Sequence, residues 1–142
     1  MLSICDGKFD LFSTLNIGID VISNLEILHR SGYLHRDLKP NNLFFGSLSK
    51  NKIKDKLNIG ILDFGSSTSI AKQEKSFNQK KKSFRYSKKI YSSDNVLENK
   101  PCQRVDDIIS IFFILIKLHT GTLPWIKFKD EKNNIDCQMI KK

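Results

Sequence analysis

The sequence predicts an α+β fold that is mainly α-helical and contains one short β-hairpin. Residues 11–30 and 105–119 are apolar at helical spacing, so two long helices are expected. Between them, two short apolar runs at residues 43–45 and 57–62 are separated by a loop rich in Lys, Asn and Ser, which is typical of a hairpin. With 142 residues, the chain is large enough for one domain with a single core.

The first helix is expected over residues 11–30. Its apolar residues recur every three or four positions, which gives the segment one apolar face. Gly32 stands where a glycine ends a helix, and His29 lies in the last turn, where it is expected to cap the helix or to face solvent. The expected apolar face consists of Leu11, Leu15, Ile19, Ile22, Leu25 and Leu28.

The segment after this helix, residues 35–42, has the residue types that phosphoryl transfer requires. Asp37 can accept the proton of an attacking hydroxyl group, Lys39 can neutralise charge on the transferring group, and Asn42 can bind a metal ion. The order of these residues matches the pattern H-R-D-L-x-x-x-N. A polar loop with an Asn-Asn turn is the alternative interpretation, but a chance match over eight residues is rare.

The expected hairpin brings a second oxygen ligand to this segment. Its first strand begins directly after Asn42, and its second strand ends just before the tripeptide Asp63-Phe64-Gly65. Because paired strands of a hairpin run in opposite directions, Asn42 and Asp63 are expected side by side. An amide oxygen and a carboxylate, completed by water and phosphate, suit Mg²⁺. The sequence therefore predicts a magnesium site at this end of the hairpin.

Residues 66–89 are polar and strongly basic. Eight Lys and Arg residues face one acid, Glu74. A solvated, mobile loop is the simplest interpretation. Nucleic-acid binding is not expected, because aromatic residues are sparse in this segment and no binding motif is present.

The second helix, over residues 105–119, is apolar on nearly every face, so it is expected to be a central buried helix. Gly121 and Pro124 end it. Its most apolar run, residues 108–116, is too short to span a bilayer, and no membrane association is expected. Residues 127–142 are charged but contain a few apolar residues at helical spacing, which indicates one further amphipathic helix.

The net charge and the cysteines indicate which partners and which cellular compartment to expect. The net charge of +9 is compatible with an anionic partner or substrate. Cys5, Cys102 and Cys137 match neither a disulfide framework nor a zinc pattern, so reduced thiols are expected. The N-terminus lacks the basic and apolar regions of a signal peptide. The expected location is therefore the cytoplasm or the nucleus.

The chain resembles the C-terminal lobe of a eukaryotic protein kinase, specifically of the casein kinase I group. Residues 104–110 (RVDDIIS) resemble R-R-D-D-L-E-S of that group, and residues 121–125 (GTLPW) resemble its G-S-L-P-W. Phe84-Arg85-Tyr86 resembles its A-R-Y, and the A-P-E motif is absent, as it is in the group. The resemblance covers nearly all of residues 1–142, from the end of helix D to about helix G, as part of one kinase domain.

This resemblance implies a protein serine/threonine kinase that uses ATP and Mg²⁺ on protein substrates, including acidic or pre-phosphorylated ones. Lys39 favours the Ser/Thr class over tyrosine kinases. Residues 66–89 would then be the activation segment, which lies beside the substrate groove. The resemblance assigns Asp37, Lys39 and Asn42 to catalysis, Lys39, Asn42 and Asp63 to the nucleotide, and Asn42 and Asp63 to the metal. It assigns structural support to His35, Arg36, Ser83 and Asp107, with Asp107 anchoring the backbone of the loop.

Some features depart from the kinase pattern. Lys82 and Phe112 replace glycines of the group, which affects the expected details of substrate docking. The sequence contains no G-x-G and no V-A-I-K-like segment before Asp37, so the small lobe is expected to be absent and the chain to be a kinase fragment or a truncated product.

Two hypotheses for function follow. The first is a serine/threonine kinase or its catalytic-lobe piece. The second is a catalytically inactive binding module that presents a basic groove to acidic or phosphorylated partners. The complete set of Asp37, Lys39, Asn42 and Asp63 favours the first, whereas the missing small lobe favours the second.

Overall fold

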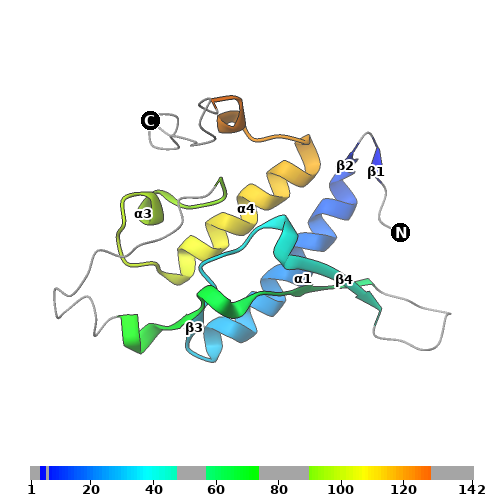
Figure 1. Cartoon of the computed structure of the whole chain (residues 1–142). Coiled ribbons are helices and arrows are strands. Elements are labelled where there is room, and N and C mark those ends of the chain that lie inside the picture. The colour runs from blue at the N-terminus through cyan, green and yellow to red at the C-terminus, as the bar shows by residue number, and fades with distance from the viewer. Residues whose placement is uncertain (1–3, 6, 48–56, 74–89, 129–142) are drawn as a thin grey trace.

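Two long helices form the centre of the fold in the computed structural model, which describes residues 4–5, 7–47, 57–73 and 90–128. Helix α1 (Leu11–Arg30) and helix α4 (Arg104–Thr120) pack against each other, as Figure 1 shows. The Asp10 carboxylate caps α1 by accepting from Ser13 N at 2.9 Å, and Gly121 ends α4 with a φ of 79°. Both predicted helices are confirmed.

Three small antiparallel pairs of strands surround the helices. Strands β4 (Leu43–Ser47) and β5 (Leu57–Ile61) form the predicted hairpin, in which Leu43 pairs with Ile61. Strand β1 (Ile4–Cys5) pairs with β2 (Lys8–Phe9). Strand β3 (Tyr33–Leu34) pairs with β6 (Thr68–Ser69). Three 3₁₀ turns (Pro40–Asn42, Phe64–Ser66, Pro124–Phe128), the short helix α3 (Asp94–Leu97) and the helical residues 70–73 complete the described elements.

The segment expected as a mobile loop, residues 66–89, is partly regular. Residues 68–69 form β6, and residues 70–73 are helical. Strand β6 is short and polar, so it can be recognised as a strand only from its pairing with β3. Sequence periodicity cannot detect such a pair. Residues 74–89 lie outside the described residues, together with Lys82, Ser83 and the Phe84-Arg85-Tyr86 motif. The amphipathic helix expected within residues 127–142 falls almost entirely outside them as well.

The buried face of α1 agrees with the predicted face only at Leu25 and, in part, at Leu28. Ile17, Val21 and Leu25 are each 1% exposed, whereas Leu11, Leu15 and Ile19 are 58%, 54% and 60% exposed. The prediction was wrong for Leu11, Leu15, Ile19 and Ile22 because α1 is apolar on two faces, and the face with small residues packs more closely. A Cβ atom at Gly18 would lie 2.9 Å from the Leu115 side chain of α4, so the close approach of the two helices depends on this glycine.

Helix α4 is also less buried than predicted. Ile111 and Ile114 are buried against α1, but Phe112 is 56% exposed and Ile116 is 42% exposed. A helix that is apolar all round is expected to be covered all round, and the described residues cover only one face of α4. Among the described residues, α1 is the one helix long and apolar enough to cross a membrane, with a mean hydropathy of 1.3, although core helices of soluble proteins have the same property.

The main core lies between α1, α4 and the hairpin. Ile59 of β5 packs into it, and Asn24 of α1 donates to the Ile59 carbonyl at 2.6 Å. Leu38, which is 3% exposed, also enters this core from the loop at residues 35–42. Because Leu38 lies between Asp37 and Lys39, its burial fixes the backbone that carries both of these side chains. A second core cluster consists of Leu97, Leu123 and Trp125.

Candidate functional site

A carboxylate of α4 binds the backbone at the start of the loop at residues 35–42. Asp107 is 1% exposed, and its oxygens accept from the backbone amides of His35 at 2.9 Å and Arg36 at 2.8 Å. A buried carboxylate without such partners would cost several kcal/mol. This is the backbone contact that the sequence resemblance assigned to Asp107. Helix α4 therefore determines where the loop begins.

His29 is part of the same network, which the sequence analysis missed. It is 8% exposed, and its Nε2 lies 2.9 Å from Oδ2 of Asp107. The expectation of a capping or surface histidine was wrong. The spacing of residues along α1 could have indicated that His29 is buried. His29 lies four residues after the buried Leu25 and eight after Val21, on the face that packs against α4.

His35 connects the loop to the chain after β5. Its Nδ1 accepts from the Asp37 amide at 3.3 Å, so the proton is on Nε2, which donates to the Leu62 carbonyl at 3.0 Å. The imidazole also packs edge-on against the Phe64 ring, with centroids 5.2 Å apart. His35 is 0% exposed, so its contribution is to position the backbone on both sides of it.

Two residues of the site have left-handed backbone conformations, which side chains other than glycine rarely adopt. Arg36 has a φ of 67° and Asp63 a φ of 62°. Such a conformation costs about 1 kcal/mol or more, and it persists where surrounding contacts enforce it. At Arg36 these contacts are Asp107 and the Ser66 carbonyl, which accepts from Arg36 Nε at 2.7 Å. Arg36 thus links the loop to the start of residues 66–73.

Asp37, Lys39 and Asn42 come together at the surface end of the loop. Lys39 Nζ lies 3.1 Å from Oδ2 of Asp37, whose side chain is 7% exposed. The Asn42 amide nitrogen donates to the Asp37 carbonyl at 2.8 Å, so its Oδ1 atom is left for another ligand. The site therefore places a carboxylate, an ammonium group and an amide oxygen within one turn of chain.

Asp63 lies at the end of the hairpin, next to Asn42. The Leu62 amide donates to the Asn42 carbonyl at 2.8 Å, which joins the two segments directly. The Asp63 side chain is exposed, and its Oδ1 accepts from the Gly65 amide at 3.3 Å. The side-chain oxygens of Asn42 and Asp63 fit the preference of Mg²⁺ for a few protein oxygens completed by water and phosphate. The described residues contain no group of three His, Cys, Asp or Glu side chains that could hold a metal without such help.

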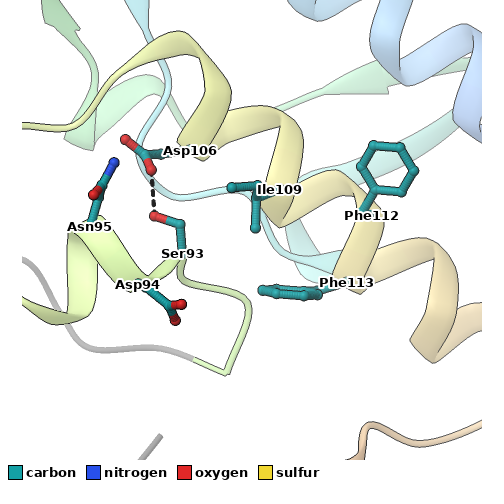
Figure 2. A pocket seen from close by; sticks show the side chains of 7 residues that line it. All are labelled: Ser93, Asp94, Asn95, Asp106, Ile109, Phe112 and Phe113. Carbon is teal, nitrogen blue, oxygen red and sulfur yellow. Dashed lines mark hydrogen bonds between the residues drawn. The ribbon is translucent and has the colours of Figure 1, made fainter. Parts of the chain in front are cut away.

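The start of α4 is fixed by a second buried carboxylate, Asp106. Its Oδ1 accepts from the Ser93 hydroxyl at 2.6 Å, and its Oδ2 accepts from the Gln103 amide at 2.6 Å. Figure 2 shows the contact with Ser93 at one end of a cavity of about 440 Å³, which Ile109 and Phe113 of α4 also line. Asp106 and the adjacent Asp107 thus have different partners, and together they lock α4 to α3 and to the loop.

Cys102 is a free thiol just before α4 and is 2% exposed. Burial, and then the negative charges of Asp107 and Asp106, raise the pKa of this thiol far above its usual range. Since the thiolate is the reactive form, Cys102 is suited to packing and not to nucleophilic chemistry.

Comparisons with known proteins show the family of the chain. The family model described as protein kinase domain matches residues 6–142. A probable serine/threonine-protein kinase of Dictyostelium discoideum is 40% identical to the chain over 129 residues, which are 89% of the chain and 25% of that relative. The chain thus spans about a quarter of the relative's length.

Proposed function

Because the chain belongs to the protein kinase family, we propose that its site transfers the γ-phosphoryl group of ATP to serine or threonine hydroxyls of proteins. The observation that carries the proposal is the pairing of Asp37 with Lys39, 3.1 Å apart, on a loop whose backbone Asp107 holds. A loop fixed in this way keeps its charged groups in place before the substrate arrives, which is the main requirement of this chemistry.

In this proposal Asp37 is the catalytic carboxylate. It orients the substrate hydroxyl and accepts its proton as the oxygen attacks the γ-phosphorus. Two contacts prepare it for this role: the His35 imidazole accepts from its amide, and the Asn42 amide donates to its carbonyl. Both contacts use the backbone of Asp37, so its carboxylate remains directed toward Lys39 and the substrate.

Lys39 supplies the positive charge. Its Nζ lies 3.1 Å from the Asp37 carboxylate, and its side chain is about one-third exposed, so it can reach an incoming phosphate. During transfer, negative charge develops on the phosphoryl oxygens, and a fixed ammonium group beside them stabilises that charge. The Ser/Thr class is also that of the similar protein from Dictyostelium discoideum.

ATP and Mg²⁺ are the proposed cofactors. Asn42 Oδ1 and the Asp63 carboxylate would hold the metal, which would supply positive charge to neutralise the phosphate groups. The contact between Leu62 N and Asn42 O holds the segments that carry these two residues together. Lys39 would contact the nucleotide.

We further propose a kinase group, an activation segment, a substrate class and a cellular location. We place the chain in the casein kinase I group, as the C-terminal lobe from helix D to about helix G, on the RVDDIIS and GTLPW segments. In this reading residues 66–89 are the activation segment, which Arg36 joins through Ser66. The net charge of +9 favours acidic or pre-phosphorylated protein substrates. A free, buried Cys102 fits a reducing compartment, the cytoplasm or the nucleus.

The test is phosphoryl transfer with radiolabelled ATP and Mg²⁺. Because the sequence contains no G-x-G to cover the phosphates, the 142-residue chain is fused behind the small lobe of a related kinase, with the remaining large-lobe helices restored after it. We expect label on matched peptides that carry Ser or Thr and none on the peptide that carries Tyr. The unfused chain is expected to be near background. Label on the Tyr peptide alone, or no label from a folded fusion that binds ATP, would contradict the proposal.

A further inference from the structure

A second cavity, of about 680 Å³, lies beside the start of α4. It is separate from the residues to which we assign phosphoryl transfer. Leu34 of β3, Ile70 and Val105 give it apolar walls. Cavities of this size, mainly apolar and with a few polar groups, are typical of small-molecule sites.

One polar atom of the cavity lining lacks a partner. Gln73 is 7% exposed, and its Nε2 donates to the Cys102 carbonyl. Its Oε1 atom is fully buried and accepts no hydrogen bond. Buried polar groups are almost always paired, since an unpaired one costs folding free energy. An N–H or O–H group of a bound molecule would satisfy this acceptor once the Gln73 amide turns it toward the cavity.

The charges around the cavity are positive. Lys100 and Arg104 line it, and no Asp or Glu does so among the described residues. Lys100 is paired with Glu98 at 2.5 Å, whereas Arg104 has no ion pair with a described residue. Arg104 is also the first residue of α4, a helix of 17 residues whose N-terminal end favours a negative charge.

The nearby acids already have hydrogen-bond donors. Asp106 accepts from Ser93 and from the Gln103 amide, and Asp107 accepts from the 35–36 backbone. An anionic group at Arg104 would therefore meet the start of α4 and a guanidinium that has no ion pair with a described residue.

We propose that this cavity binds a small amphipathic anion: an aromatic or aliphatic body that carries one N–H or O–H donor and one carboxylate, sulfonate or phosphate group. The donor meets Gln73 Oε1, the anionic group meets Arg104, and the body lies against Leu34, Ile70 and Val105. Leu34 directly precedes His35 and Val105 lies two residues before Asp107, so the bound molecule contacts both elements that hold the 35–42 loop.

The test uses 8-anilinonaphthalene-1-sulfonate, which combines an N–H donor, an apolar body and a sulfonate. The dye is titrated with the 142-residue chain while its fluorescence is recorded, and the number of dye molecules bound per chain is measured by calorimetry. We expect one site, weakened about tenfold by Arg104→Glu and by a smaller factor by Gln73→Leu. Arg104→Lys keeps the charge and is expected to retain most of the binding.

Two control variants separate this cavity from other apolar surfaces. Arg30→Glu makes the same charge change on the exposed surface of α1, and Phe112→Ser removes an exposed aromatic ring that lines the cavity of Figure 2. Both are expected to titrate like the unaltered chain. Circular dichroism establishes that each variant is folded. Equal binding by Arg104→Glu and the unaltered chain, or equal losses in Arg30→Glu or Phe112→Ser, would overturn the proposal.

Discussion

Replacing Asp107 with Asn is expected to loosen the start of the 35–42 loop, because the Asp107 carboxylate accepts three hydrogen bonds, two of them from amides of this loop. Oδ2 accepts from His29 and from the His35 amide, and Oδ1 accepts from the Arg36 amide. An asparagine has the same shape but offers only one acceptor oxygen. Its best orientation puts that oxygen in the Oδ2 position and turns the NH₂ group toward the Arg36 amide. At least one donor then loses its partner.

The size of the effect follows from these contacts. An unpaired buried N–H group costs about 1–3 kcal/mol, and the two remaining bonds weaken because the acceptor is no longer charged. Removing a buried charge offsets part of this. We expect Asp107→Asn to lower the free energy of unfolding by about 2–4 kcal/mol, which is a large share of the ~5–15 kcal/mol of a typical domain.

Urea denaturation can measure this change, because the chain has a single tryptophan, Trp125, which is 9% exposed and reports unfolding by fluorescence. With a slope of about 2 kcal/mol per molar urea, the midpoint should fall by about 1–2 M. Glu26→Gln is the control, since its exposed pair with Arg30 contributes at most about 0.5 kcal/mol. A midpoint for Asp107→Asn within about 0.3 M of the unaltered chain, at an unchanged slope, would refute the role assigned to Asp107.

Three further predictions concern the metal, the cap of α1 and the buried thiol. Mg²⁺ without nucleotide should bind the isolated chain only weakly, because few protein oxygens are offered. The Asp63→Asn variant should bind Mg²⁺ more weakly still. Tight Mg²⁺ binding in calorimetry that Asp63→Asn leaves unchanged would contradict the site. Hydrogen bonds from Ser13 lower the pKa of Asp10 below its ordinary value of 3.8, so the stability that Asp10 provides should be complete above that pH and lost as pH falls through the lowered pKa. Melting temperatures of Asp10→Ala and the unaltered chain should therefore differ at pH 6 and converge near pH 2, and a constant difference would disprove the linkage. Cys102 should react with a thiol reagent at pH 8 only after unfolding, because burial raises its pKa; rapid labelling of the folded chain with Cys5 and Cys137 replaced by Ser would argue against a buried position.

The parts of the fold that the sequence predicted depend on local signals. Helix α1 is bounded by Asp10 and Gly32, and the β4–β5 hairpin follows from two apolar runs around a polar loop. The contact of Asp107 with the 35–36 backbone was expected from motif resemblance, and the hydrogen bonds are present. Each of these features is specified by residues close together or by a recognisable motif.

The parts that the sequence did not predict depend on which surfaces meet. Periodicity finds the apolar residues of α1 but not the face that packs, since Gly18 and its small neighbours allow α4 to approach on a side that leaves Leu15 and Ile19 exposed. His29 joins the site only because Asp107, 78 residues away, accepts from it. The partner of β6 is similarly distant along the chain, so neither contact leaves a local pattern.

The most direct measurement is the single-turnover rate of phosphoryl transfer by the fused kinase with Asp37→Asn. Asparagine keeps the size of the side chain but cannot accept the hydroxyl proton, so we expect the rate to fall by about 10²–10⁴-fold. The affinity for ATP with Mg²⁺ should change little, because the proposed metal ligands are Asn42 and Asp63. The matched variant Glu26→Gln, on the exposed surface of α1, should keep the full rate. A fusion with Asp37→Asn that transfers phosphate as fast as the unaltered one would show that this carboxylate is not catalytic.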